Sequence, residues 1–208
     1  VEAALETGKH VVTANKAMLA HHGQTMAEAA ETAGLALKFE AAVAGGIPIV
    51  KALGQGLMAN GMQRVMGVMN GTCNYILTEM EAREASYEEI LEEAQKLGYA
   101  EADPSFDVDG YDTAHKLAIL TTLCFGYELA PDKIRVEGIT SISQHDIQVA
   151  AELGYKIKLL GIAQRTDDGI EQRVHPTFVP KGSAIAGVDG VMLDIIGADE
   201  TIEQVYHL

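Results

Sequence analysis

Five carboxylates and a lysine lie close together in the middle of this 208-residue chain. The carboxylates are those of Glu101, Asp103, Asp107, Asp109 and Asp112, and the lysine is Lys116. Asp112 and Lys116 are four positions apart, so they share one face if this part of the chain is helical. An acidic pocket suits a ligand amino group, because an ammonium has three donors to satisfy, and a neighbouring lysine can transfer a proton. A solvated acidic loop followed by a helix with an ordinary ion pair would give the same pattern, and it stays open as the alternative.

A calcium-binding loop is a further interpretation of the acidic residues. Asp107, Asp109 and Gly110 match the third, fifth and sixth positions of the EF-hand template. That template also needs a carboxylate at its first position and a bidentate Glu at its twelfth, where this chain has Ser105 and Lys116. An ammonium cannot replace the main calcium ligand, so the pattern argues against calcium.

The acidic segment lies between two segments with clear helix signals. Pro104 and Gly110 punctuate residues 101–112, which we expect to be a loop with fixed turns rather than a helix. After Gly110 the apolar residues recur at spacings that suit a buried helix. Ahead of the loop, Ser86 and Glu89 predict a capped helix that ends at Gly98.

The rest of the chain alternates between strand and helix signals. They predict strands at residues 10–13, 35–43 and 62–70, helices at 16–32, after Pro48, from Asn70 or Thr72 onward and at about 143–153, and a hairpin about Asp168 and Gly169. This order predicts an α+β domain, with a mixed sheet and helices packed on one face.

The composition argues against several classes of partner. Lys and Arg number 15 against 30 Asp and Glu, which gives a formal net charge of -15. Nucleic acids and anionic membrane surfaces need basic patches, so neither is an expected partner. Cys73 and Cys124 are isolated in apolar surroundings, which favours buried thiols over zinc ligands. No apolar run approaches the ~20 residues of a membrane span, and we expect a cytoplasmic protein.

The segment LGYAEADPSFDVDGYDTAHKLAIL, residues 97–120, resembles the catalytic segment of homoserine dehydrogenases. This family interconverts L-aspartate 4-semialdehyde and L-homoserine with a nicotinamide cofactor. Further segments resemble the same family in the same order: GKHVVTANKAMLA (8–20), KFEAAVAGGIPIV (38–50), VMGVMNGTCNYILTEM (65–80), GYKIKLLGIA (154–163) and HPTFVPKGSAIAGVDGVMLDI (175–195). An ordered series of motifs is more specific than any one of them.

The resemblance implies a role for each residue at a matching position. Lys116 would transfer the proton, and Glu101 and Asp112 would hold the substrate amino group. Asp107 would orient Lys116 or a water. Lys16 would lie near the cofactor and the substrate carboxylate, and the backbone at Gly98 would contact the cofactor. By itself a lysine is a weak base at neutral pH unless burial lowers its pKa, and nearby carboxylates oppose that shift. Family members can carry an acid where this chain has Phe106, which leaves a paired acid there in question.

The resemblance also implies a monovalent cation site. The side chain of Glu40 and the carbonyls of Val43, Gly45 and Ile47 would supply hard oxygen ligands, which suit sodium better than a transition metal. Such a site would brace the loop between the two halves of the enzyme.

The implied organisation is an interior fragment of a longer enzyme. Residues 1–36 would be the C-terminal remnant of a nucleotide-binding Rossmann domain, and residues 37–208 the α+β catalytic and dimerisation domain of a homodimer or tetramer. The family reaction uses NADP or NAD in threonine, methionine and isoleucine biosynthesis, and the choice of cofactor is not readable from these residues. Without the glycine-rich cofactor turn of the family, the fragment alone is expected to be inactive. The alternative is a non-catalytic assembly or amino-acid-binding module derived from such an enzyme.

Overall fold

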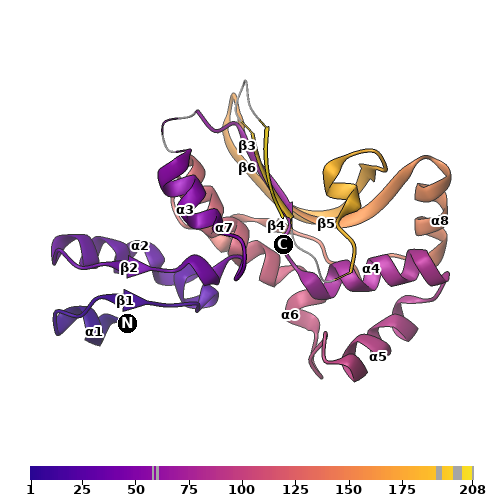
Figure 1. The fold of residues 1–208 in the computed structure, drawn as a ribbon, viewed down its shortest axis with the longest axis horizontal. Coiled ribbons are helices and arrows are strands. Elements are labelled where there is room, and N and C mark those ends of the chain that lie inside the picture. Colours follow the sequence, from indigo (N-terminus) through magenta and orange to yellow (C-terminus); the bar gives the residue numbers. More distant parts are fainter. Residues whose placement is uncertain (58, 60, 191–193, 199–202, 208) are drawn as a thin grey trace.

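The first elements of the chain form a small group beside a larger sheet (Figure 1). The computed structural model describes residues 1–57, 59, 61–190, 194–198 and 203–207. The group consists of α1 (Glu2–Glu6), β1 (Val11–Val12), α2 (Lys16–Thr32) and β2 (Leu37–Lys38), with β1 and β2 paired in parallel. Asn15 caps α2 by accepting from the backbone N–H of Met18 at 3.0 Å, and Gly34 follows its end with a φ of 67°. The helix predicted at residues 16–32 is confirmed.

The strand predicted at residues 35–43 is wrong beyond Lys38. Residues Glu40–Ala42 form a 3-10 helix, η1. The physical reason is the side chain of Glu40, whose carboxylate accepts from the backbone N–H groups of Val50 at 2.7 Å and Lys51 at 3.0 Å. These bonds hold the chain in a turn at the start of the short helix α3 (Ile49–Lys51), which continues as the π-helical turn η2 (Ala52–Gly56).

A six-stranded mixed sheet forms the larger part, in the order β4-β6-β5-β3-β7-β8. Its strands are β3 (Arg64–Val68), β4 (Arg135–Val136), β5 (Tyr155–Thr166), β6 (Gly169–Pro180), β7 (Asp194–Ala198) and β8 (Glu203–His207). Neighbouring strands are antiparallel except β4 and β6, which are parallel. The predicted hairpin is confirmed, with Thr166 paired to Gly169 at its turn.

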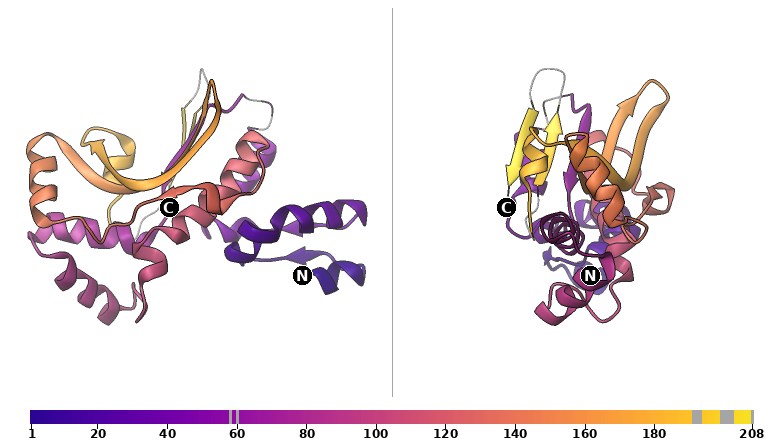
Figure 2. Two further views of the ribbon diagram at one scale, coloured as in Figure 1. Left: turned by 180° about the vertical axis from the view of Figure 1, so that it is seen from behind. Right: turned by 90° about the vertical axis from the view of Figure 1, so that its right-hand side faces the viewer.

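Helices cover one face of this sheet, as predicted. Figures 1 and 2 show α4 (Gly71–Arg83) and α7 (Tyr111–Phe125) running beneath the strands, with α8 (Gln144–Glu152) at one end. Alternate residues of β5 face the two sides: Leu159 and Ala163 join the helix-side core, whereas Leu160 and Ile162 pack with Ile185 of η4 (Ala184–Gly187) on the other. Because side chains alternate along a strand, the apolar residues of β5 contribute to the cores on both faces of the sheet.

The acidic segment is not the helix-free loop that was expected. A one-turn helix, α6 (Ser105–Val108), lies inside it, between α5 (Tyr87–Leu97) and α7. Asp103 starts this turn by accepting from the backbone N–H of Ser105 at 3.1 Å and from its hydroxyl at 2.6 Å. The Pro104 carbonyl then accepts from the N–H of Val108 at 3.0 Å. Proline at the start of a helical turn is compatible with the turn, because its missing N–H is not needed there.

The chain then reverses at Gly110 to begin α7. Gly110 has a φ of 91°, and a Cβ there would lie 3.0 Å from the side chain of Val136. Both conditions favour glycine, since other residues rarely adopt this φ and the space is already filled. Among the described residues, no helix is both long and apolar enough to cross a lipid bilayer.

Candidate active site

The centre of the candidate site is an ion pair in the first two turns of α7. Lys116 Nζ donates to Asp112 Oδ2 at 2.7 Å and to the backbone carbonyl of Met69 at 2.7 Å. The predicted neighbourhood of Asp112 and Lys116 on one helix face is confirmed. Met69 lies just beyond the end of β3, so a strand end and a helix together fix the lysine. Asp112 is 3% exposed, which removes this pair from most of the solvent.

A second lysine reaches the same carboxylate from the N-terminal group. Lys16, at the start of α2, places its Nζ 2.9 Å from Asp112 Oδ1. Each oxygen of Asp112 therefore holds one ammonium, and the carboxylate joins α2 to α7.

Asn70 is the part of the site that the sequence did not reveal. Its side-chain amide donates to Asp107 Oδ1 at 2.7 Å and to Asp112 Oδ2 at 2.9 Å. Its carbonyl oxygen accepts from the N–H of Cys73 at 2.8 Å and so caps α4. In the sequence, Asn70 stands out only as a helix cap, and that signal contains nothing about the two carboxylates.

The two carboxylates have opposite electrostatic environments. Burial alone would raise the pKa of Asp112, but Lys116, Lys16 and Asn70 outweigh it and lower that pKa below its usual value. For Asp107, burial raises the pKa, and the charge of Asp112 adds to the rise, while the hydrogen bond from Asn70 opposes it. The partners of Asp112 thus favour its ionised form, whereas burial and the charge of Asp112 disfavour the ionised form of Asp107.

Aromatic rings border the cluster on the side of α6. Phe106 lies with its ring edge-on to His115 at 5.3 Å between centroids, and Lys16 Nζ is 5.8 Å from the centre of the Phe106 ring. His115 also contacts His21 of α2 edge-on at 5.0 Å. Burial and then the neighbouring His21 lower the pKa of His115, so it is a neutral ring at physiological pH. At the position of Phe106, an apolar ring rather than an acid faces Lys16.

Gly98 and Glu101 lie in the turn that follows α5. Glu101 is exposed, and its backbone carbonyl accepts from the side chain of Gln95 at 3.0 Å. Within the described part of the chain, its carboxylate forms no hydrogen bond or ion pair with the Asp112 cluster. Gly98 ends α5 with a φ of 80°, and a Cβ there would meet nothing within 4 Å, so its backbone is open to a ligand. Thr72 donates to the next carbonyl, that of Tyr99, at 2.6 Å, and ties this turn to the start of α4.

The predicted cation ligands lie on a separate turn. Both oxygens of Glu40 accept backbone N–H groups of α3, and the Ile47 carbonyl accepts from the N–H of Ile49 at 2.8 Å. Val43 is buried and Gly45 is exposed. Across the described ranges, no group of three or more His, Cys, Asp and Glu side chains is arranged to hold a metal ion.

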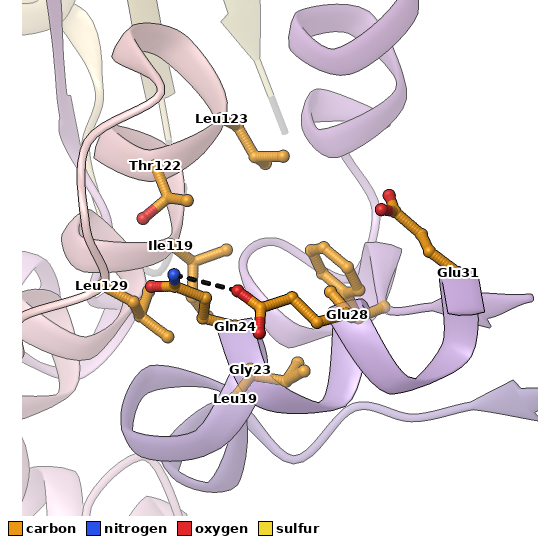
Figure 3. Close-up of a pocket in the computed structure, with 11 residues that line it drawn as sticks. Leu19, Gly23, Gln24, Glu28, Glu31, Ile119, Thr122, Leu123 and Leu129 are labelled. Atoms are coloured by element: carbon orange, nitrogen blue, oxygen red, sulfur yellow. Dashed lines mark hydrogen bonds between the residues drawn. The ribbon is translucent and has the colours of Figure 1, made fainter. Parts of the chain in front are cut away.

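An apolar pocket lies one or two turns further along α2 and α7 (Figure 3). It has a volume of about 220 Å³ and lies between Leu19 and Gly23 of α2, Ile119 and Leu123 of α7, and Leu129. Gln24 and Glu28 at its rim bond to each other at 3.2 Å. It has none of the charged groups of the Asp112 cluster and so is distinct from the candidate active site.

Two protein-family models and several curated proteins match this chain. Residues 48–206 match the family described as homoserine dehydrogenase, and residues 1–40 match the one described as homoserine dehydrogenase, NAD binding domain. A homoserine dehydrogenase of Neisseria gonorrhoeae is 48% identical over 205 residues, covering 98% of this chain and 47% of that protein. A homoserine dehydrogenase of Pseudomonas aeruginosa is 52% identical over 189 residues, covering 91% of this chain and 44% of that protein.

Solved structures give the same relationship. A homoserine dehydrogenase of Thiobacillus denitrificans superposes with a TM-score of 0.97 at 48% identity, over 99% of this chain and 48% of that one. A hyperthermophilic archaeal homoserine dehydrogenase in complex with NADPH superposes with a TM-score of 0.86 at 25% identity, over 100% of this chain and 60% of that one. The chain spans about half the length of the curated relatives it matches. On these matches, the chain belongs to the homoserine dehydrogenase family.

Proposed function

We propose that this chain provides the substrate and proton-transfer site of an NAD(P)-dependent oxidoreductase that interconverts L-homoserine and L-aspartate 4-semialdehyde. The observation that carries the proposal is the position of Lys116, fixed by the buried carboxylate of Asp112 and the carbonyl of Met69. An ammonium has three donors. Asp112 and Met69 take two of them, so the third is available to a substrate oxygen.

The reaction needs a proton at one defined atom. When bound, the nicotinamide supplies or accepts the hydride at the carbonyl carbon. In reduction of the aldehyde, Lys116 donates a proton to the oxygen that becomes the alcohol, and in the reverse direction it accepts that proton. The ion pair with Asp112 holds Nζ in place for both directions and prevents its movement into solvent.

The substrate ammonium needs an anion that is not already neutralised. Among the described residues, Asp112 is bound by Lys16, Lys116 and Asn70, whereas Asp107 is bound only at Oδ1, by Asn70. We therefore assign the substrate ammonium first to Asp107, with Glu101 and Asp112 as the further carboxylates of the substrate site. We assign Lys16 to the substrate carboxylate, and the support is that its side chain is one-third exposed while its Nζ contacts Asp112.

The cofactor would meet the protein at Lys16 and Gly98. The open backbone at Gly98 fits such an approach, since no atom within 4 Å of a Cβ position blocks it. The match of residues 1–40 to a homoserine dehydrogenase NAD binding domain and the archaeal relative named with NADPH support NADP(H) or NAD(H) as the cofactor. The separate family matches to residues 1–40 and 48–206 support the division into a nucleotide-binding remnant, residues 1–36, and a catalytic domain, residues 37–208.

The remaining parts of the proposal follow the family. They are a sodium ion held by Glu40 and the carbonyls of Val43, Gly45 and Ile47, a cytoplasmic homodimer or tetramer, and a place in threonine, methionine and isoleucine biosynthesis. For sodium, the support is that each Glu40 oxygen has accepted one N–H and retains a further lone pair.

The direct test is reduction of NADP or NAD by the intact protein in the presence of L-homoserine. We expect reduced cofactor to form only when homoserine is present, and 2-aminobutyrate, which lacks the hydroxyl, to inhibit without reacting. No homoserine-dependent reduction with either cofactor would overturn the proposal and leave an amino-acid-binding or assembly module.

A further inference from the structure

One side chain, that of Asn70, connects three parts of the site. Its Oδ1 accepts from the N–H of Cys73 at 2.8 Å, and its Nδ2 donates to Asp107 Oδ1 at 2.7 Å and to Asp112 Oδ2 at 2.9 Å. The residue is 4% exposed, so water does not compete for these bonds. The amide thus forms three hydrogen bonds to protein groups, and together these bonds fix the orientation of the side chain.

Helix capping alone does not explain an asparagine at this position. Serine, threonine and aspartate cap a helix about as well, because each offers an oxygen to the first free N–H groups. Asparagine differs in offering two N–H donors together with that acceptor. A serine has one hydroxyl hydrogen and could reach one carboxylate, and an ionised aspartate has none. The need for two donors therefore comes from Asp107 and Asp112.

These two carboxylates need a donor between them. Like charges that lie close together disfavour ionisation of one of the pair. Lys16 and Lys116 compensate Asp112, but the hydrogen bond from Asn70 is the largest influence that keeps Asp107 ionised against burial and against the charge of Asp112. Without the amide, Asp107 would bind a proton at a higher pH.

We propose that Asn70 is a positioning residue that holds Asp107 and Asp112 side by side, Asp107 free to receive a substrate ammonium and Asp112 paired with Lys116. The substrate half of this statement rests on the proposed function. Asn70 acts through the two carboxylates and leaves the reacting atoms to Lys116.

The test compares Asn70→Ser and Asn70→Asp with a matched control, Asn74→Ser, in the intact protein. Both changes at Asn70 keep an oxygen that can cap α4. Asn74 is buried on the same helix, but its amide donates to the carbonyls of Val188 at 3.1 Å and Gly190 at 2.9 Å, away from the site. Its side-chain oxygen accepts from Lys158 Nζ at 2.9 Å, so the control measures what loss of a buried amide and its hydrogen bonds on α4 does away from the site.

The primary measurement is kcat/KM for homoserine across pH. For Asn70→Ser we expect a fall of about 10- to 100-fold near neutral pH, the size expected for lost hydrogen bonds to charged groups. The acidic limb of the pH profile of Asn70→Ser should also move to higher pH. In Asn70→Asp the limb should move further, because this variant adds a third carboxylate beside Asp107 and Asp112. In Asn74→Ser the limb should stay at its wild-type position. An unmoved limb in both Asn70 variants would overturn the inference, because a purely structural role does not change a titration.

A second measurement needs no turnover. In an NMR titration of the side-chain carboxyl carbons, Asp107 should titrate at higher pH in Asn70→Ser than in the wild type. If Asp107 shows that shift but the wild-type protein has no homoserine-dependent activity, the proposed function fails, and the inference that Asn70 positions the two carboxylates stands. If activity is present and Asp107 titrates unchanged, the inference about Asn70 fails and the proposed function stands.

Discussion

Lys116 Nζ and Asp112 Oδ2 lie 2.7 Å apart on successive turns of α7, and Asp112 is 3% exposed. In water an ion pair at i and i+4 is worth little, because solvent screens it. Here the carboxylate is buried and bound by a second lysine, Lys16, and by Asn70. Its charge therefore matters both for the fold and for the position of the proton-transfer group.

Replacing Asp112 with Asn should destabilise the protein. The change leaves Lys16 and Lys116 without their shared anion, at an expected cost of about 3–5 kcal/mol in the free energy of unfolding near neutral pH. Because the folded pKa of Asp112 is lowered, its stabilisation is present above the unfolded pKa and is lost as the pH falls through the folded value. Urea unfolding should thus show the difference between wild type and variant shrinking in acid. Asp168→Asn, in the exposed hairpin turn, is the control and should change little.

Replacing Asp107 with Asn should affect stability in the opposite direction to Asp112→Asn. Burial and the charge of Asp112 raise the folded pKa of Asp107, so its ionised form costs stability at neutral pH, and that cost disappears as the pH falls through the folded pKa. We expect the variant to be as stable as the wild type or more so near neutral pH, while kcat/KM for homoserine falls about tenfold or more through loss of the ammonium partner. A variant with lower stability and unchanged kcat/KM would show that Asp107 is a structural residue.

Gly138 packs directly against the acidic segment, and Gly138→Ala should disturb it. A Cβ there would lie 2.2 Å from the carbonyl oxygen of Val108 and 2.5 Å from the Cα of Asp109. Backbone atoms cannot move aside cheaply, so we expect a loss of at least about 2–3 kcal/mol in urea unfolding. Gly182→Ala, where a Cβ would meet nothing within 4 Å, should leave stability near the wild-type value. Equal stabilities for the two variants would contradict the close packing.

Glu40→Gln tests the role of the Glu40 turn. One oxygen remains to accept from Val50 or Lys51, so about 1 kcal/mol of stability should be lost. If sodium also binds, the melting temperature of the wild type should rise more in sodium chloride than in choline chloride, and Glu40→Gln should lose this difference. Glu31→Gln, exposed on α2, is the matched control. Equal responses of the wild type to both salts would exclude the sodium site and leave Glu40 as a cap.

Signals that depend on neighbouring residues were enough to predict much of the fold. The helix Lys16–Thr32, the capping box of Ser86 and Glu89, and the hairpin at Gly169 each follow from a few adjacent residues, and the structure contains all three. The strand expected at residues 35–43 was wrong beyond Lys38, because Glu40 bonds to residues ten and eleven positions away. The short helix α6 was missed because proline and acids favour a loop as much as one helical turn.

Contacts between distant segments could not be predicted from the sequence. The meeting of Lys16 with Asp112 and of Asn70 with both carboxylates depends on the packing of α2, α4 and α7. Lys158 is another example: in an apolar strand segment it is 1% exposed and bonds to Asn74, the Val188 carbonyl and Asp189. Burial first, opposed by Asp189, lowers the pKa of this lysine. Its sequence neighbours gave no indication of these partners.

The central claim is that Lys116 transfers the proton, and the most direct measurement is turnover of homoserine by Lys116→Ala in the intact protein. The control is Lys96→Ala, which removes a surface lysine paired with Glu92 at the same i, i+4 spacing. With circular dichroism unchanged in both, kcat should fall by about 10²- to 10⁴-fold in Lys116→Ala, the range for loss of a general acid or base, and stay at the wild-type value in Lys96→Ala. Turnover by folded Lys116→Ala close to that of the wild type would contradict the account.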